Sequence, residues 1–212
     1  ARDLSTIAKA IISDHPKYYS IYAKKYFEHN NINQPNRNRL LWRDKSVDGL
    51  KTGKTDAAGY CLVASAKRRD MRLISVILGA KSDEVRAQES QRLLSYGFRY
   101  FDTQTVYAAG EILKSNAKLW YGVDEFLNLT ISENVTLTFP RGSEKNFQAN
   151  ILVHEVIKAP IKAGQELGSL QVKLDGNILI DVPLVAKKDV EKAGIFARLV
   201  DWIILFFTDL LS

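Results

Sequence analysis

Cysteine, methionine and proline are scarce in this sequence of 212 residues, which contains one Cys, one Met and five Pro. The single cysteine, Cys61, cannot form an internal disulfide and has no neighbours at metal-ligand spacing. We expect it to be a small buried residue in an apolar strand. His15, His29 and His154 form neither a catalytic triad nor a metal-ligand pattern, so the sequence predicts no metal site.

A signal peptide and an initiator methionine are also lacking. The sequence opens Ala1-Arg2-Asp3-Leu4, and its only methionine is Met71. We therefore expect the chain to begin inside a longer protein or after processing. Clusters of Arg and Lys interleaved with stacking aromatic residues are absent, which argues against a nucleic-acid partner.

The charges that are present are unevenly distributed. Residues 1–100 contain 19 Lys and Arg against 10 Asp and Glu, whereas residues 101–212 contain 11 against 14. Such an asymmetry suggests two units with different partners. Apolar residues make up 46% of the chain, which is enough to form a folded core.

The first hundred residues mix helical and strand patterns. Apolar residues at helical spacing predict a helix over residues 3–14, capped by Asp3, and a second helix over residues 83–100. Residues 17–45 are rich in Asn, Tyr and Arg, and the run 30–36 within them is expected to be a loop. Three strands are predicted between the helices, the last two joined by a polar turn: 49–55, 60–66 and 71–79.

Beyond residue 101 the pattern changes to that of β-strands. Asp175-Gly176-Asn177 is a favourable hairpin turn between the last two of them. The predicted strands are 126–131, 135–139, 147–155, 169–174 and 178–185. Their spacing alone predicts an all-β module of about ninety residues.

The final segment, residues 194–212, combines twelve large apolar side chains with only three charges. A membrane-spanning helix needs about 20 mainly apolar residues, and these charges disfavour spanning. Arg198, Asp201 and Asp209 fall near one side of a helical wheel, so we expect an amphipathic helix in the membrane interface. The alternative is a helix packed on the β module. Because acidic residues lie among the nearby lysines, we expect salt to affect membrane binding little.

The strongest chemical signal is the run Val47-Asp48-Gly49-Leu50-Lys51-Thr52-Gly53-Lys54-Thr55. The Lys51 ammonium and the Thr52 hydroxyl can receive a carboxylate, and Gly53 lets a ligand backbone approach closely. A backbone N–H just beyond Gly53 can help to hold an oxyanion. Here Lys-Thr-Gly lies in an apolar strand, and a hairpin and then a helix follow it. Serine penicillin-recognising enzymes require this context for the motif.

On these residues the chain resembles the D-alanyl-D-alanine carboxypeptidases. The similarity extends over residues 36–42, 48–53, 55–56, 58–60, 62–66 and 72–74 and includes the helix with Arg86. The β module and the tail resemble the second domain and membrane anchor of the penicillin-binding protein 5 and 6 type. The resemblance implies an α+β fold with three parts. They are the C-terminal part of a penicillin-recognising transpeptidase-like domain (1–101), an all-β sandwich domain (102–190) and an amphipathic membrane-anchor helix (191–212).

The resemblance also implies a substrate-binding site. Lys51-Thr52-Gly53 would line it together with Lys54, where relatives often carry His. Arg37 and Arg86 match family arginines near the site, and Arg86 would help to bind the terminal carboxylate of the substrate. The alternative for both arginines is ordinary surface charge.

The family's nucleophile belongs to a Ser-x-x-Lys motif and its helper to Ser-x-Asn, and both normally precede the Lys-Thr-Gly strand. Neither motif occurs before Lys51 here. Matches at Ser115…Lys118 and at Ser132-Glu133-Asn134 lie downstream, and we attribute them to chance. We therefore expect no catalytic residue in this chain, which would be inactive by itself.

For the parent protein the resemblance implies a serine-type hydrolase without metal or other cofactor. It would remove the terminal D-alanine from peptidoglycan pentapeptides through an acyl-enzyme, and β-lactams would acylate the same serine. The expected location is the periplasmic face of the inner membrane, as a peripheral protein attached through residues 194–212. The N-terminal part of the same protein is a further expected partner. A class A β-lactamase, a related endopeptidase and a catalytically silent membrane-attached β module remain as alternatives.

Overall fold

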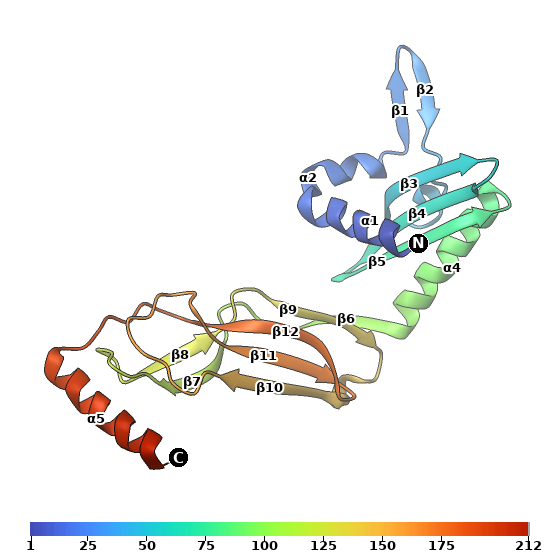
Figure 1. The fold of residues 1–212 in the computed structure, drawn as a ribbon. Coiled ribbons are helices and arrows are strands. Elements are labelled where there is room, and N and C mark those ends of the chain that lie inside the picture. The colour runs from blue at the N-terminus through green and yellow to red at the C-terminus, as the bar shows by residue number, and fades with distance from the viewer. Residues whose placement is uncertain (212) are drawn as a thin grey trace. The chain divides into compact units, whose positions relative to one another are not determined.

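The computed structural model describes residues 1–211 and the side chains of residues 1–208. Ser212 and the side chain of Asp209, both assigned above to the amphipathic tail, lie outside the described residues. The chain has an α+β fold and divides into two compact units, Ala1–Thr103 and Gln104–Ser212. Their elements are labelled in Figure 1.

The first unit combines helices with a three-stranded antiparallel sheet of order β3-β4-β5. The strands of this sheet are β3 (Val47–Thr55), β4 (Gly59–Arg68) and β5 (Met71–Ala80). The helices are α1 (Arg2–Asp14), α2 (Pro16–Tyr19), α3 (Leu40–Arg43) and α4 (Asp83–Tyr100), with a 3-10 helix over Ser20–Ala23. A separate hairpin of β1 (Tyr26–His29) and β2 (Ile32–Pro35) projects from this unit (Figure 1).

The central strand β4 is buried on both faces. Leu62 and Ala64 belong to one apolar cluster with Leu94 of α4, whereas Val63 belongs to another with Ala8 of α1. Successive side chains of a strand point to opposite faces, so a strand between two helical layers is mainly apolar on both. The buried exception, Ser65, accepts a hydrogen bond from Arg72. Burial on both faces explains the continuous apolar run of the sequence. It also gives β3, which pairs with β4, a firmly held partner.

Helix 83–100 and all three strands of the sheet are confirmed. The loop expected over residues 30–36 is wrong, because Ile32–Pro35 forms β2 of a hairpin, whose turn residues Asn30 and Asn31 both have positive φ. Asn tolerates this conformation, so a run of asparagines that suggested a loop forms a tight turn. Asp3 is not a cap, since α1 begins one residue earlier with Ala1 at the N-cap. Cys61 is only partly buried, contrary to expectation.

The second unit contains a five-stranded sheet of order β10-β11-β12-β8-β7 and a two-stranded sheet of β6 and β9. Its strands are β6 (Phe101–Tyr107), β7 (Ile112–Lys118), β8 (Phe126–Thr130), β9 (Val135–Pro140), β10 (Phe147–Val153), β11 (Glu166–Leu174) and β12 (Asn177–Ala186), with a 3-10 helix over Glu144–Asn146. Leu137 and Phe139 of β9 share one core cluster with Leu170 and Val172 of β11. The alternating strands thus bury one face each.

Five strands of this unit fulfil the predictions, and β6 and β7 are additional. Asp175 and Gly176 form the expected hairpin turn, both with positive φ, between the paired residues Leu174 and Asn177. The sequence of β7, Ile-Leu-Lys-Ser-Asn-Ala-Lys, does not alternate, because register shifts interrupt its pairing with β8.

Helix α5 (Ile195–Leu211) ends the described chain. None of the described helices has the length and apolar character needed to cross a membrane. Most large apolar side chains of α5 are exposed, among them Phe196 at 86% and Ile195 at 74%. Asp201 nevertheless ties the helix to the β unit, because its carboxylate accepts a hydrogen bond of 2.6 Å from the Tyr121 N–H.

Candidate substrate-binding cleft

The segment Lys51-Thr52-Gly53 lies on an edge strand. Among the described residues, β3 pairs only with β4, so the other side of β3 presents backbone N–H and C=O groups that no strand satisfies. The strand is buried from Gly49 to Leu50, and its side chains then become exposed from Lys51 onward, apart from a half-buried Thr52. An exposed edge of this kind accepts an extended peptide as an additional strand.

The buried start of β3 is fixed by polar contacts that hold the motif in place. Asp48 makes a two-pronged ion pair with Arg72 of β5, at 2.9 and 2.7 Å. Asn38 is 1% exposed, and its Nδ2 donates to the Gly49 carbonyl at 2.8 Å. Buried groups satisfied in this way are rigid. The strand therefore leaves the core with a set direction before it reaches Lys51.

All six residues predicted for the site line one open cavity of about 940 Å³. Lys51, Thr52, Gly53 and Lys54 come from β3, Arg86 comes from α4, and Arg37 comes from the segment after β2. The remaining lining residues are Pro35, Asn36, Arg39, Tyr60 and Asp83. We call this cavity, with all of its lining residues, the β3 cleft.

The β3 cleft is strongly basic. Five Lys and Arg residues line it against one carboxylate, that of Asp83. Asp83 is already paired with Arg39 at 2.6 Å. Within the described part of the chain, Arg37, Lys51 and Lys54 have no carboxylate partner: Lys51 donates to the Thr52 carbonyl, and Lys54 lies 5.2 Å from the centre of the Tyr60 ring. A cavity lined by charges of one sign concentrates ligands of the opposite sign.

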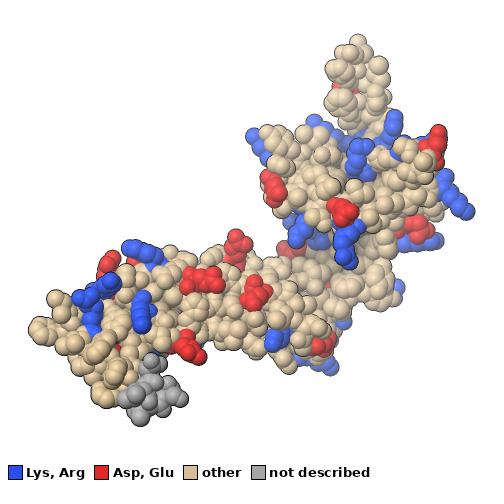
Figure 2. Space-filling view, in the orientation of Figure 1, with Lys and Arg blue, Asp and Glu red and all other residues tan. Residues whose placement is uncertain are grey.

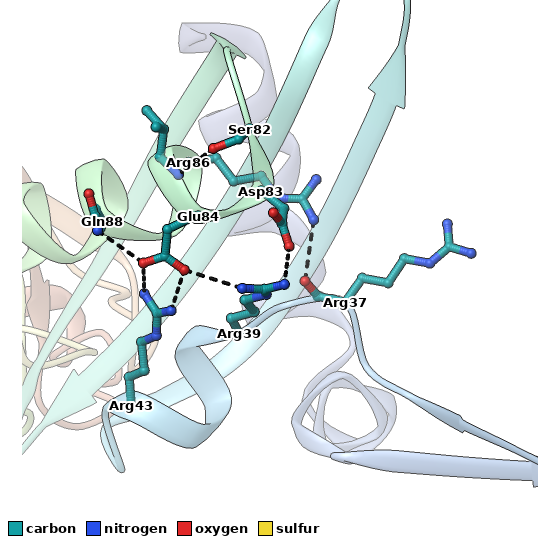
Figure 3. A network of polar contacts seen from close by, with 9 residues as sticks. Arg37, Arg39, Arg43, Ser82, Asp83, Glu84, Arg86 and Gln88 are labelled. Atoms are coloured by element: carbon teal, nitrogen blue, oxygen red, sulfur yellow. Dashed lines mark hydrogen bonds and ion pairs between the residues drawn. The ribbon is translucent and has the colours of Figure 1, made fainter.

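The wall behind the cleft is held by a network of arginines around the first turn of α4 (Figure 3). Ser82 caps the helix, because its Oγ accepts the Val85 N–H at 3.1 Å. The Glu84 carboxylate accepts hydrogen bonds from Arg43 at 2.9 and 2.6 Å and from Arg39 at 3.2 Å. Hydrogen bonds from Arg43 and the positive charges of both arginines lower the pKa of Glu84 to about 2. Glu84 thus stays ionised at ordinary pH and joins α4 to α3.

Arg86 connects three backbone segments beside the cleft. The residue is 5% exposed, and its guanidinium donates to the carbonyls of Gly53 at 3.2 Å, Cys61 at 3.3 Å and Arg37 at 3.3 Å. Figure 3 shows the last of these bonds, with the Arg37 side chain extending away from it. One side chain therefore connects β3, β4 and the Arg37 segment. Because Arg86 is buried, it is not an ordinary surface charge. Contact of Arg86 with a substrate carboxylate stays a proposal.

Comparison with known proteins agrees with this arrangement. A family model for D-alanyl-D-alanine carboxypeptidase matches residues 1–82, and one for the penicillin-binding protein 5 C-terminal domain matches residues 101–192. The chain is 44% identical to D-alanyl-D-alanine carboxypeptidase DacC of Escherichia coli K12 over 209 residues, which cover 98% of this chain and 52% of that protein. It is 40% identical to the DacA protein of the same strain, over 98% of this chain and 52% of that one.

The chain belongs to the D-alanyl-D-alanine carboxypeptidase family. A crystal structure of penicillin-binding protein 5 from Haemophilus influenzae has a similar fold, with a TM-score of 0.81 and 38% identity. The match covers 91% of this chain and 56% of that one. The chain thus spans about half the length of the relatives it matches.

The two downstream matches to carboxypeptidase motifs lie on the second unit and have structural partners. The Lys118 ammonium pairs with Glu125 at 2.8 Å. The Asn134 side-chain oxygen accepts the Ala109 N–H at 2.8 Å. Both contacts belong to the connections of the β module, which supports the attribution of these matches to chance.

The structure adds Asn38, Tyr60 and Arg72 to the residues that shape the cleft of this carboxypeptidase-family chain. Asn38 and Arg72 fall in segments that carried the resemblance, but nothing in the sequence alone showed that they hold β3. Tyr60 precedes Leu62 by two residues on β4 and could have been placed opposite Lys54 from a hairpin register. That register depends on the turn at residues 56–58, which the sequence did not define.

Proposed function

We propose that this chain is the C-terminal portion of a serine-type D-Ala-D-Ala carboxypeptidase and that the β3 cleft binds the end of a peptidoglycan pentapeptide. The observation that carries the proposal is the open edge of β3 at Lys51-Thr52-Gly53 inside a basic cleft. The peptide would lie along this edge as an added strand. Its terminal carboxylate would then accept charge-assisted hydrogen bonds from Lys51 and a hydrogen bond from Thr52.

The lack of a side chain at Gly53 supports this placement. A Cβ built there would meet only the Cys61 Cβ, at 3.8 Å, which is an ordinary contact. The fold itself therefore does not require glycine at this position. Glycine leaves the space over this part of the strand free, so that a ligand can approach the backbone closely.

The chemistry would be acyl transfer with a serine supplied by the rest of the protein. The serine oxygen attacks the carbonyl carbon of the penultimate D-alanine, and the peptide C–N bond breaks. The departing nitrogen takes up a proton, and D-alanine leaves. Water then hydrolyses the ester and restores the serine. A β-lactam would acylate the same serine, and no step needs a metal or another cofactor.

The β module favours this proposal over the two enzymatic alternatives. The relatives that match almost the whole chain are named carboxypeptidases. Residues 101–192 match a domain named for penicillin-binding protein 5, which the alternatives of a class A β-lactamase or an endopeptidase do not explain. For the chain by itself we propose no catalysis.

The proposed activity is tested with the full-length protein and a peptide that ends in D-Ala-D-Ala. We expect release of D-alanine, quantified enzymatically, and loss of that release after incubation with a penicillin. A full-length protein that is folded and binds penicillin covalently, yet releases no D-alanine, would contradict the carboxypeptidase assignment.

We further propose that α5 attaches the protein to the periplasmic face of the inner membrane. The exposed apolar side chains of α5 support this proposal, because burying them stabilises binding in proportion to their area, at about 25 cal/mol per Å². We expect the chain to float with phosphatidylcholine vesicles, and the chain without residues 194–212 to remain in the dense fraction. Equal flotation of both forms would instead favour a helix that only packs on the β unit.

A further inference from the structure

Three basic residues surround a pocket where α5 meets the β unit. The pocket has a volume of about 420 Å³, and its charged lining residues are Lys158, Lys192 and Arg198, with no carboxylate. Figure 2 shows basic side chains gathered at the end of this unit that carries α5. The apolar part of the lining includes Tyr121, Leu199 and Trp202. We call this cavity the α5 pocket.

The backbone of the β unit places the two lysines. Trp120 forms a parallel bridge with Lys158, and Gly122 forms an antiparallel bridge with Lys192. Tyr121 lies between these bridges, and its carbonyl accepts the Ala193 N–H at 2.7 Å. The two lysines therefore flank Tyr121 on segments that these backbone bridges hold together.

Helix α5 places the third basic residue over the same point. Asp201 accepts the Tyr121 N–H, and Arg198 precedes Asp201 by one helical turn, so both lie on the face of α5 that meets Tyr121. The Arg198 Nε is buried and has no hydrogen-bond partner among the described residues. A buried donor without an acceptor is costly, and an anion in the α5 pocket would satisfy it.

Two acidic residues that the sequence places near these cations, Asp189 and Glu191, are engaged with Lys162. Asp189 accepts from the Ala163 N–H at 2.7 Å and from Lys162 at 3.1 Å. Glu191 lies 3.9 Å from the same lysine. Asp201 lies on the same face of α5 as Arg198, where its carboxylate accepts the Tyr121 N–H, and it does not line the α5 pocket. The described lining of the α5 pocket thus has three cations and no carboxylate.

We propose that the α5 pocket binds the phosphate of an anionic phospholipid headgroup, which builds on the proposed membrane attachment. Three cations suit a phosphate diester in a headgroup that has no positive charge of its own. The exposed apolar neighbours Ile195, Leu199 and Trp202 suit the glycerol and first acyl carbons, which free phosphate lacks. The pocket thus makes binding selective for anionic lipids, whereas the apolar face of α5 binds any bilayer.

The test is flotation with vesicles of phosphatidylcholine alone and of phosphatidylcholine mixed with phosphatidylglycerol. We expect the chain to bind the mixed vesicles at least about tenfold more tightly, since each basic residue near an anionic surface contributes about a fivefold gain. The variant K158Q/K192Q/R198Q should lose this preference and keep its binding to neutral vesicles. The double variant K158Q/K192Q leaves α5 unchanged and should lose most of the preference.

A matched control separates the pocket from net charge. The variant K114Q/K145Q/K173Q removes the same charge from other parts of the β unit and should retain the preference. Millimolar inorganic phosphate at constant ionic strength should not abolish it. Equal loss in both triple variants, or complete competition by free phosphate, would overturn the lipid site. Equal binding to both vesicle types by the unmodified chain would overturn the lipid site alone, whereas no binding to either would overturn membrane attachment as well.

Discussion

Incubated with a labelled penicillin, the isolated chain should acquire no covalent adduct. No Ser-x-x-Lys occurs before Lys51, and Lys118, the lysine of the only downstream match, is paired with Glu125. The Lys118 ammonium donates to Glu125, and Ser115 and Lys118 both lie on β7, outside the β3 cleft. The β3 cleft would thus retain its basic lining without a nucleophile.

The measurement is the intact mass of the chain after incubation, with the full-length protein as the positive control. We expect one penicillin per full-length molecule and none on the isolated chain. A stoichiometric adduct on the isolated chain would contradict this account. Its position would then be mapped by digestion, with a Ser115→Ala variant to test the exposed serine of β7.

In the full-length protein, Lys51→Ala should lower kcat/KM for D-alanine release by about 10- to 100-fold or more. The loss of a charge-assisted hydrogen bond costs about 1.5–3 kcal/mol, and a contact that strengthens in the transition state costs more. Lys51 is exposed on the open part of β3, so its removal should not disturb the core. The fold can be checked by thermal unfolding, where we expect little change.

Lys67→Ala is the matched control for this substitution. Lys67 is an exposed lysine of the same sheet, on β4, and does not line the β3 cleft. Its removal changes the net charge by the same amount as Lys51→Ala. Because Lys67 lies outside the β3 cleft and the core, kcat/KM should stay within about twofold. If Lys51→Ala also stayed within about twofold, the assignment of Lys51 to the substrate would be wrong.

The sequence alone was sufficient for elements whose pattern and local chemistry agree. Helix 83–100 has acidic residues in its first turn, and the hairpin 175–177 has a glycine where positive φ is needed. Lys51-Thr52-Gly53 could be placed on a strand because its neighbours on both sides read as strand. In these cases each residue's local preference and the tertiary fold favour the same conformation.

The remainder depended on contacts between distant residues. The buried state of Arg86 follows from three carbonyls supplied by segments 25 to 49 residues away, which no local pattern encodes. The partial exposure of Cys61 follows from its place opposite Gly53, where the missing Cβ leaves the strand open. Likewise, Arg198 meets Lys158 and Lys192 at a place where Asp201 ties α5 to Tyr121.

The central claim is that the β3 cleft binds the terminal carboxylate of the substrate through Lys51. The most direct test compares kcat/KM for a peptide that ends in D-Ala-D-Ala with kcat/KM for its C-terminal amide, in the full-length protein and its Lys51→Ala variant. We predict a strong preference for the free carboxylate in the unmodified protein and a ratio near unity in the variant, because the amide offers no charge to Lys51. An unchanged preference in Lys51→Ala would contradict the account, since another residue would then be recognising the carboxylate.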